Sequence, residues 1–126
     1  MPQNSKILVI DDSPFIFKAV KKAVEPFGHQ MLDQAFNGQE GLARIEECNP
    51  DIIILDVTMP IMDGIETAKR LFSKNPNANV IMLSAMGDDE LIKSAMAIGV
   101  QQFLSKPFTP DDLLNAINNI SAKEGL

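Results

Sequence analysis

The sequence feature that most constrains the fold is a run of four apolar residues, Ile52 to Leu55, which ends at the carboxylate of Asp56. Consecutive apolar residues without alternation are typical of a strand buried on both faces, as in a parallel sheet between two layers of helices. Asp56 then lies at the carboxyl end of this strand, where open α/β sheets bind their ligands. The run therefore predicts a buried parallel strand that presents one acidic side chain at a sheet edge.

Strand-like and helix-like segments alternate along the whole chain. The expected strands are residues 6–10, 31–36, 52–55, 80–83 and 101–105, and the expected helices are residues 14–27, 39–48, 65–74, 87–98 and 110–120. Right-handed crossovers turn five such repeats into a parallel sheet with helices on both faces. We therefore predict a doubly wound α/β fold with five parallel strands in the order 2-1-3-4-5.

Composition narrows the class of protein. The 126 residues suffice for one domain with a core, and no apolar run approaches the length of a membrane span. A net charge of -6 argues against direct contact with nucleic acid. Cys48 is the single cysteine, so no internal disulfide can form, and we expect a cytoplasmic protein. The single histidine, His29, follows Gly28 in an expected loop, and we predict that it is exposed.

Polar side chains follow four of the five expected strands. Strand 1 is followed by Asp11 and Asp12, strand 3 by Asp56, strand 4 by Ser84 and strand 5 by Lys106. Three carboxylates at one sheet edge repel each other, and a hard divalent cation relieves that repulsion. Oxygen-only ligands favour Mg²⁺, with Mn²⁺ as the alternative, over Zn²⁺.

A lysine and a serine beside the same carboxylates complete a set of groups suited to phosphoryl transfer. A carboxylate oxygen attacks the phosphorus atom, while the ammonium group and a metal ion neutralise the phosphoryl oxygens. A serine hydroxyl donates a hydrogen bond to the product. Each residue alone is weakly informative, and their joint occurrence at the correct strand ends makes the prediction specific.

Four motifs together resemble the response-regulator receiver domain of the CheY type, over about residues 6–121. They are Ile7-Leu8-Val9-Ile10-Asp11-Asp12, Ile54-Leu55-Asp56-Val57-Thr58-Met59-Pro60-Ile61-Met62-Asp63-Gly64, Ser84-Ala85 and Phe103-Leu104-Ser105-Lys106-Pro107-Phe108. Two segments, Thr58-Met59-Pro60 and Ser84-Ala85-Met86-Gly87, are similar in sequence to the chemotaxis branch of this family. The resemblance implies a flavodoxin/CheY-like fold and a single receiver domain over residues 1–126, with its core at about residues 5–122 and no output domain.

The resemblance also implies a role for each site residue. Asp56 is the phospho-acceptor, and Mg²⁺ is held by Asp11, Asp12, Asp56 and the backbone carbonyl of Thr58. Lys106 contacts the phosphoryl group, and the Lys106–Pro107 peptide bond is cis. Ser84 and Phe103 are the switch residues, where the family often has Thr and Tyr; Phe103 therefore offers no hydroxyl to a partner. Thr58 and Met86 tune dephosphorylation, and the apolar Met86 predicts a long-lived phosphoryl group.

The function implied is a phospho-accepting switch of a two-component system, with no enzymatic activity beyond its own phosphotransfer and dephosphorylation. A histidine kinase or a phosphotransfer protein donates the phosphoryl group. A protein target then binds the face formed by the fourth helix, the fifth strand and the fifth helix. The chain acts as a monomer or as a phosphorylation-dependent dimer, and the sequence leaves both states open.

Three other readings compete with this one. A Mg²⁺-dependent aspartyl phosphatase of the haloacid-dehalogenase class needs a second Asp two residues after the nucleophile, where this chain has Thr58. A flavodoxin-like FMN carrier needs a hydroxyl-rich phosphate loop where Asp11 and Asp12 stand, and Trp and Tyr are absent. A receiver fold that serves as an interaction module without phosphorylation would not need the full acid set with Lys106.

Overall fold

The five expected strands form one parallel sheet in the predicted order, β2-β1-β3-β4-β5. The structure is a computed structural model that describes residues 5–123, so residues 1–4 and 124–126 of the expected domain lie outside the described residues. The strands are β1 (Lys6–Ile10), β2 (Gln30–Ala35), β3 (Ile52–Asp56), β4 (Val80–Ser84) and β5 (Gln102–Ser105). The predicted fold class is confirmed.

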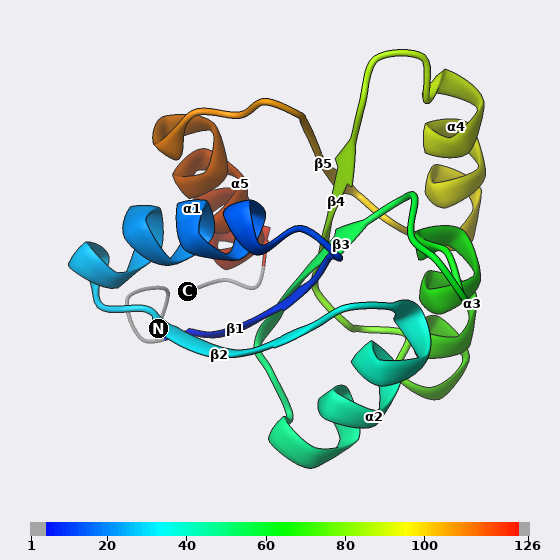
Figure 1. The fold of residues 1–126 in the computed structure, drawn as a ribbon, viewed down its shortest axis with the longest axis horizontal. Helices are drawn as coiled ribbons and strands as arrows, with labels where there is room; N and C mark the ends of the chain where they lie inside the picture. Colours follow the sequence, from blue (N-terminus) through cyan, green and yellow to red (C-terminus); the bar gives the residue numbers. More distant parts are fainter. Residues whose placement is uncertain (1–4, 124–126) are drawn as a thin grey trace.

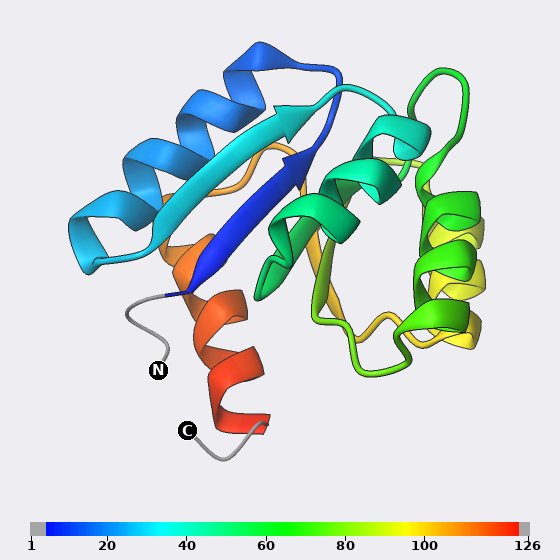
Figure 2. The same ribbon diagram turned by 90° about the horizontal axis from the view of Figure 1, so that it is seen from below.

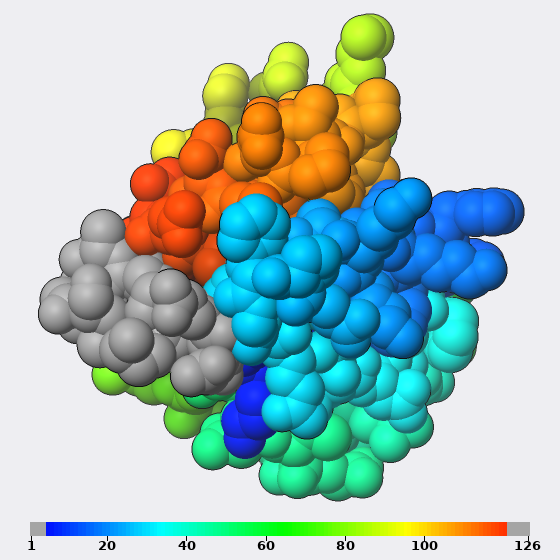
Figure 3. Space-filling model, turned by 90° about the vertical axis from the view of Figure 1, so that its left-hand side faces the viewer, coloured from blue at the N-terminus to red at the C-terminus, as the bar shows by residue number. Residues whose placement is uncertain are grey.

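Five α-helices cover the two faces of the sheet (Figure 1). They are α1 (Pro14–Val24), α2 (Gly38–Cys48), α3 (Gly64–Lys74), α4 (Asp89–Ile98) and α5 (Pro110–Lys123). Helices α1 and α5 pack together on one face, and α2, α3 and α4 cover the other (Figures 1 and 2). The space-filling view of the first face shows α1 lying directly against α5 (Figure 3). Within residues 5–123, no helix is both long enough and apolar enough to cross a bilayer.

Alternate residues of each central strand enter the two halves of the core. In β3, Ile52 and Ile54 pack under α1 and α5, whereas Ile53 and Leu55 pack under α2, α3 and α4. All four side chains are almost completely buried. Full burial of one such side chain contributes about 1.5–3 kcal/mol relative to its exposure. The unbroken apolar run therefore holds β3 firmly at the centre of the sheet, with Asp56 at its end.

The first helix ends earlier than its sequence pattern predicts. α1 stops at Val24, and a 3-10 turn (η2, Glu25–Phe27) follows it. Pro26 lacks the N–H group that would continue the α-helical hydrogen bonds, which explains the change. Gly28 then adopts a left-handed conformation with φ +92° and ends the turn.

The prediction that His29 is exposed is wrong, because its side chain is buried, with 7% of the residue exposed. The left-handed Gly28 turns the chain straight into β2 without an intervening loop. The N–H group of Gln30 then donates to the carbonyl of Ser5, which fixes this corner against the start of β1. The burial of the imidazole lowers its pKa below the ordinary value of 6.5.

Candidate functional site

The carboxyl ends of four strands meet at one edge of the sheet. Ile10 pairs with Leu55 across β1 and β3, and Asp56 pairs with Leu83 across β3 and β4. Ser84 pairs with Ser105, so Lys106 follows directly on the next strand. The parallel register therefore brings the ends of β1, β3, β4 and β5 together, as the alternation of segments predicts.

Three carboxylates gather at this edge. Asp11, Asp12 and Asp56 each offer an oxygen atom, and these atoms lie within 4.8 Å of one another. Asp11 is fully buried, Asp56 is 6% exposed, and Asp12 is exposed at the mouth of the cluster. Asp12 is thus the carboxylate of the cluster that is most open to solvent.

Lys106 supplies the positive charge beside this cluster. Its Nζ atom lies 3.2 Å from Oδ2 of Asp11 and 3.2 Å from Oδ2 of Asp56. Burial and the neighbouring Asp11 carboxylate raise the pKa of Asp56, although Lys106 opposes this shift. Burial alone would lower the pKa of Lys106, but the two carboxylates outweigh it and raise that pKa. The ammonium group therefore remains charged and only partly compensates the acids.

The donor atoms present fit a hard divalent cation. Oδ2 of Asp11 is buried and accepts no hydrogen bond within the described residues, although Nζ of Lys106 lies 3.2 Å away in an ion pair. Because three carboxylates meet one ammonium group here, a further cation would compensate the remaining negative charge and occupy the free lone pair of this oxygen. Carboxylate oxygens on an open, partly hydrated edge are the ligands that Mg²⁺ prefers.

The loop after β1 is held by a residue that the sequence did not reveal. Gln34 is buried in β2, and its amide group donates to the carbonyls of Asp11 (2.8 Å) and Ser13 (3.0 Å). The N–H group of Ser13 in turn donates to Oδ1 of Asp11. Gln34 thus fixes the backbone that carries the paired acids. A single glutamine in a weakly patterned strand gives no signal from which this role follows.

The loop after β3 packs tightly against the acceptor strand. The N–H group of Gly64 donates to the carbonyl of Val57 at 2.9 Å. A Cβ atom at position 64 would collide with the carbonyl oxygen of Asp56 and the Cα atom of Val57. Only glycine permits this approach, so α3 begins directly beside the acidic cluster. The N–H group of Thr58 lies 3.3 Å from Oδ1 of Asp56 and orients its carboxylate.

The same loop contains one strained residue. Ile61 has φ +69°, and the N–H group of Met62 donates to the carbonyl of Pro60 at 2.7 Å, which makes a γ-turn. A β-branched residue is disfavoured in this region of conformational space. The Ile61 side chain is 78% exposed, so it gains little from packing. The sequence marks this segment only as a long loop.

The remaining predicted residues lie in β4, in β5 or in the loops that follow these strands. Ser84 is buried at the end of β4, and its carbonyl accepts the N–H group of Lys106 at 2.7 Å. The Lys106–Pro107 peptide bond is cis. Phe103 is half-buried and packs against the core on the side of α2, α3 and α4. Met86 lies in the loop after β4 with its side chain fully exposed.

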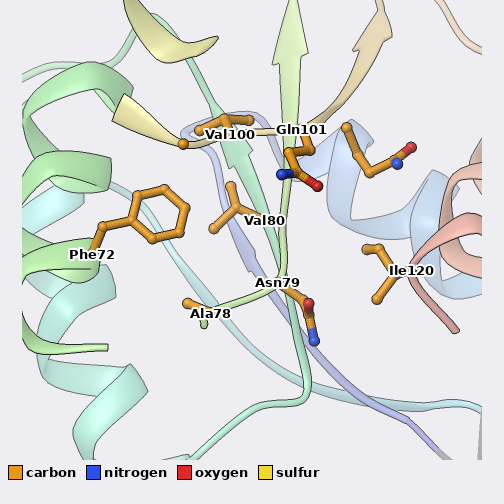
Figure 4. A pocket seen from close by; sticks show the side chains of 9 residues that line it. Phe72, Ala78, Asn79, Val80, Val100, Gln101 and Ile120 are labelled. Atoms are coloured by element: carbon orange, nitrogen blue, oxygen red, sulfur yellow. The ribbon is translucent and has the colours of Figure 1, made fainter. Parts of the chain in front are cut away.

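A small cavity lies at the opposite, amino-terminal edge of the sheet. It is lined by Phe72, Val80, Val100, Gln101 and Ile120 among others (Figure 4). Its volume is about 30 Å³, enough for a few water molecules and too small for a sizeable ligand. The convergent polar groups lie instead at the carboxyl edge, which is therefore the candidate site.

Comparison with known proteins decides the family. Residues 7–118 match the response regulator receiver domain. The chain belongs to the response regulator receiver domain family. This receiver domain is 34% identical to the chemotaxis protein CheY of Thermotoga maritima, over 94% of this chain and 98% of that protein. It is 38% identical to the chemotaxis protein CheY of Listeria monocytogenes, over 89% of this chain and 94% of that protein.

Solved structures agree with this assignment. A response regulator receiver domain protein from Clostridium thermocellum superimposes on this receiver domain with a TM-score of 0.87 and 36% identity, covering 96% of this chain and 97% of that one. The receiver domain of the Francisella response regulator 1452 superimposes with a TM-score of 0.85 and 36% identity, covering 96% of this chain and 99% of that one. Receiver domains are phospho-accepting switches of two-component signalling rather than enzymes in the usual sense. They bind Mg²⁺ through an acidic cluster and act between histidine kinases and downstream targets.

Proposed function

We propose that this receiver domain accepts a phosphoryl group on Asp56 from a phosphohistidine of a partner kinase or phosphotransfer protein. The observation that carries the proposal is the convergence of Lys106 on a buried Asp56 inside a cluster of three acids. In the transfer, an oxygen of Asp56 forms a P–O bond as the P–N bond of the donor breaks. The only other reactions of the domain are its own phosphotransfer from small donors and its own dephosphorylation.

A divalent cation completes this site. Asp11, Asp12, Asp56 and the backbone carbonyl of Thr58 would hold Mg²⁺, with Mn²⁺ as the alternative. When bound, the ion supplies positive charge that neutralises the phosphoryl oxygens. Asp11 is buried, Gln34 holds its backbone carbonyl, and the N–H group of Ser13 donates to its Oδ1 atom, so the carboxylate is held in place before any ion arrives.

The protein side chains then stabilise the product. Lys106 already lies beside the acceptor oxygen, so it contacts the phosphoryl group with little rearrangement. Ser84 donates its hydroxyl hydrogen to a phosphoryl oxygen, which draws the loop after β4 toward Asp56. Phe103 then packs into the space that this movement vacates. These steps bias two pre-existing arrangements of one fold. Thr58 and Met86 flank the acceptor and set the rate of dephosphorylation.

The changed surface is the face formed by α4, β5 and α5. The side chain of Met96 on α4 is 60% exposed, and Leu91 is exposed on the same helix. Adaptable methionine side chains suit a surface whose contacts change. We propose that a protein target in the cytoplasm binds this face. Because the relatives above are chemotaxis proteins, we place the domain in a pathway of that type.

Beryllofluoride, which mimics an aspartyl phosphate, provides the test. We expect beryllofluoride to bind only in the presence of Mg²⁺ and not to bind Asp56→Asn. Isothermal titration calorimetry measures this binding. Asp51→Asn is the matched control, because Asp51 is an exposed carboxylate at the amino edge of the sheet. A folded wild-type protein that binds no beryllofluoride in Mg²⁺ would instead favour an interaction module without phosphorylation.

A further inference from the structure

The peptide unit between Ser84 and Ala85 is fixed at both of its polar ends. Its carbonyl oxygen accepts the N–H group of Lys106 at 2.7 Å. Its N–H group donates to Oδ2 of Asp88, also at 2.7 Å. The N–H group of Asp88 returns a bond to the carbonyl of Ala85 at 3.2 Å, which closes a tight loop. One carboxylate thus holds the backbone that follows the switch hydroxyl.

This use of Asp88 contrasts with three of the other four helix starts, since Ser13 before α1 also makes no side-chain cap. Asn37, Asp63 and Thr109 each accept a backbone N–H group from the first turn of their own helix, α2, α3 and α5 respectively. Asp88 occupies the same position before α4, but its side chain makes no such cap. Its carboxylate turns back to Ala85 instead. The acid therefore serves the loop rather than the helix, although Asp89 and Glu90 still supply negative charge in the first turn of α4.

The bond between Ala85 and Asp88 lies just beyond the part of β4 that is fixed, which ends at Leu83. The carbonyl of Leu83 accepts the N–H group of Val57 at 3.0 Å, next to the acceptor Asp56. The peptide after Ser84 is the next one along the chain. Beyond it the loop is open: Met86 is fully exposed, and Gly87 has φ +93° with no atom within 4 Å of the place of a Cβ. Movement of Ser84 toward Asp56 therefore has to change this peptide and its bond to Asp88.

We infer that Asp88 is a positioning residue that holds the Ser84–Ala85 peptide in the unphosphorylated arrangement and so opposes the switch. This inference rests on the proposed roles of Asp56 and Ser84. Phosphorylation has to break or lengthen the bond between Ala85 and Asp88 before Ser84 reaches the phosphoryl group. A hydrogen bond of this kind corresponds to a factor of about 2 to 10 in an equilibrium constant. Loss of the bond should raise the apparent affinity for a phosphate mimic by that factor.

The test measures Mg²⁺-dependent beryllofluoride affinity in Asp88→Ala, Asp88→Asn and the control Asp89→Ala. Asp89 is the adjacent exposed acid at the start of α4, so its variant reports the effect of removing one negative charge next to Asp88. We expect affinity to rise about 2- to 10-fold in Asp88→Ala. A smaller rise is expected in Asp88→Asn, whose amide oxygen still accepts the bond, and no comparable rise in Asp89→Ala.

A second readout observes the bond itself. The amide proton of Ala85 should shift upfield in the NMR spectrum of Asp88→Ala and stay in place in Asp89→Ala. Equal affinities in Asp88→Ala and Asp89→Ala, or an unchanged Ala85 amide, would overturn the inference. If Asp88→Ala does not fold, the comparison of Asp88→Gly with Asp89→Gly decides in the same way, because glycine also lacks the acceptor and is tolerated at a helix N-cap. If the wild-type protein binds no beryllofluoride, both the proposed function and this inference are wrong. If the wild-type protein and all variants bind it equally, only this inference is wrong.

Discussion

The ammonium group of Lys106 lies at the same distance, 3.2 Å, from carboxylate oxygens of Asp56 and Asp11. One cation therefore bridges the ends of two neighbouring strands, β1 and β3. The acid cluster also includes Asp12, so the acids outnumber this cation. The bridge stabilises the cluster while leaving negative charge for a divalent cation.

Replacement of Lys106 by Met should destabilise the metal-free protein. The variant leaves buried carboxylates without their partner, and loss of one partner of a buried pair costs about 3–5 kcal/mol. Because the side chain of Lys106 is 26% exposed, solvent reduces this cost, and we expect about 1–3 kcal/mol in urea unfolding. Addition of Mg²⁺ should recover part of the loss.

Lys93→Met is the matched control for that experiment. Lys93 pairs with Glu90 at 3.6 Å, and both side chains are largely exposed. Such surface pairs contribute at most about 1 kcal/mol. Equal losses in the two variants, without any recovery in Mg²⁺, would contradict the assigned role of Lys106.

Burial of His29 should make stability fall on the acid side of neutrality. Desolvation lowers the pKa of folded His29 below its unfolded value of 6.5, so the unfolded chain binds the proton more readily. The stabilising contribution is complete above pH 6.5 and is lost as pH falls from there toward the folded pKa. His29→Leu should remove this dependence, since the chain has one histidine. Urea midpoints at pH 7.5 and 5.0 measure the effect, and parallel changes in wild type and His29→Leu would refute it.

Relief of strain at Ile61 should stabilise the domain. Ile61→Asn keeps the γ-turn with a residue that tolerates positive φ, and we expect a gain of about 1 kcal/mol in the free energy of unfolding. Ile61→Val retains the β-branch and should change stability by less than about 0.5 kcal/mol. Because the side chain is exposed, neither change creates a cavity. A gain of the same size in both variants would show that strain is not its source.

The apolar Met86 should give phosphorylated Asp56 a long lifetime. Its side chain offers no acid or amide to orient an attacking water molecule. Met86→Glu should shorten the lifetime about 10-fold or more, because positioned acid–base groups accelerate such reactions by at least this much. Met96→Glu, at an exposed position of α4, should leave the lifetime unchanged. A wild-type lifetime of only seconds that Met86→Glu does not alter would contradict this prediction.

The strands and the carboxyl-edge acids followed from the sequence because each depends on a local pattern. Apolar runs such as Ile52 to Leu55 identify buried strands, and parallel topology then brings Asp11 and Asp56 to one edge. Because all the strands are parallel, their carboxyl ends lie at the same edge of the sheet, and this prediction needed no knowledge of side-chain contacts.

The features that the sequence did not predict have a different cause. Each depends on contacts between segments that are distant in the sequence or on a local reversal of the chain. Gln34 acts through carbonyls more than 20 residues away, and nothing in its own neighbourhood announces this role. His29 is buried because Gly28 reverses the chain directly into β2, where the sequence suggests a loop. Asp88 resembles an ordinary helix cap until its carboxylate is seen to bond Ala85. Loop geometry and tertiary packing decide such features.

The central claim is that Asp56 accepts the phosphoryl group, and intact-mass spectrometry tests it most directly. The protein is incubated with phosphoramidate, a small donor with a P–N bond, in the presence and absence of Mg²⁺. The account predicts the addition of one phosphoryl group that requires Mg²⁺, is removed by hydroxylamine, and is absent from Asp56→Asn. A folded protein that stays unmodified, or a modification that persists in Asp56→Asn, would contradict it.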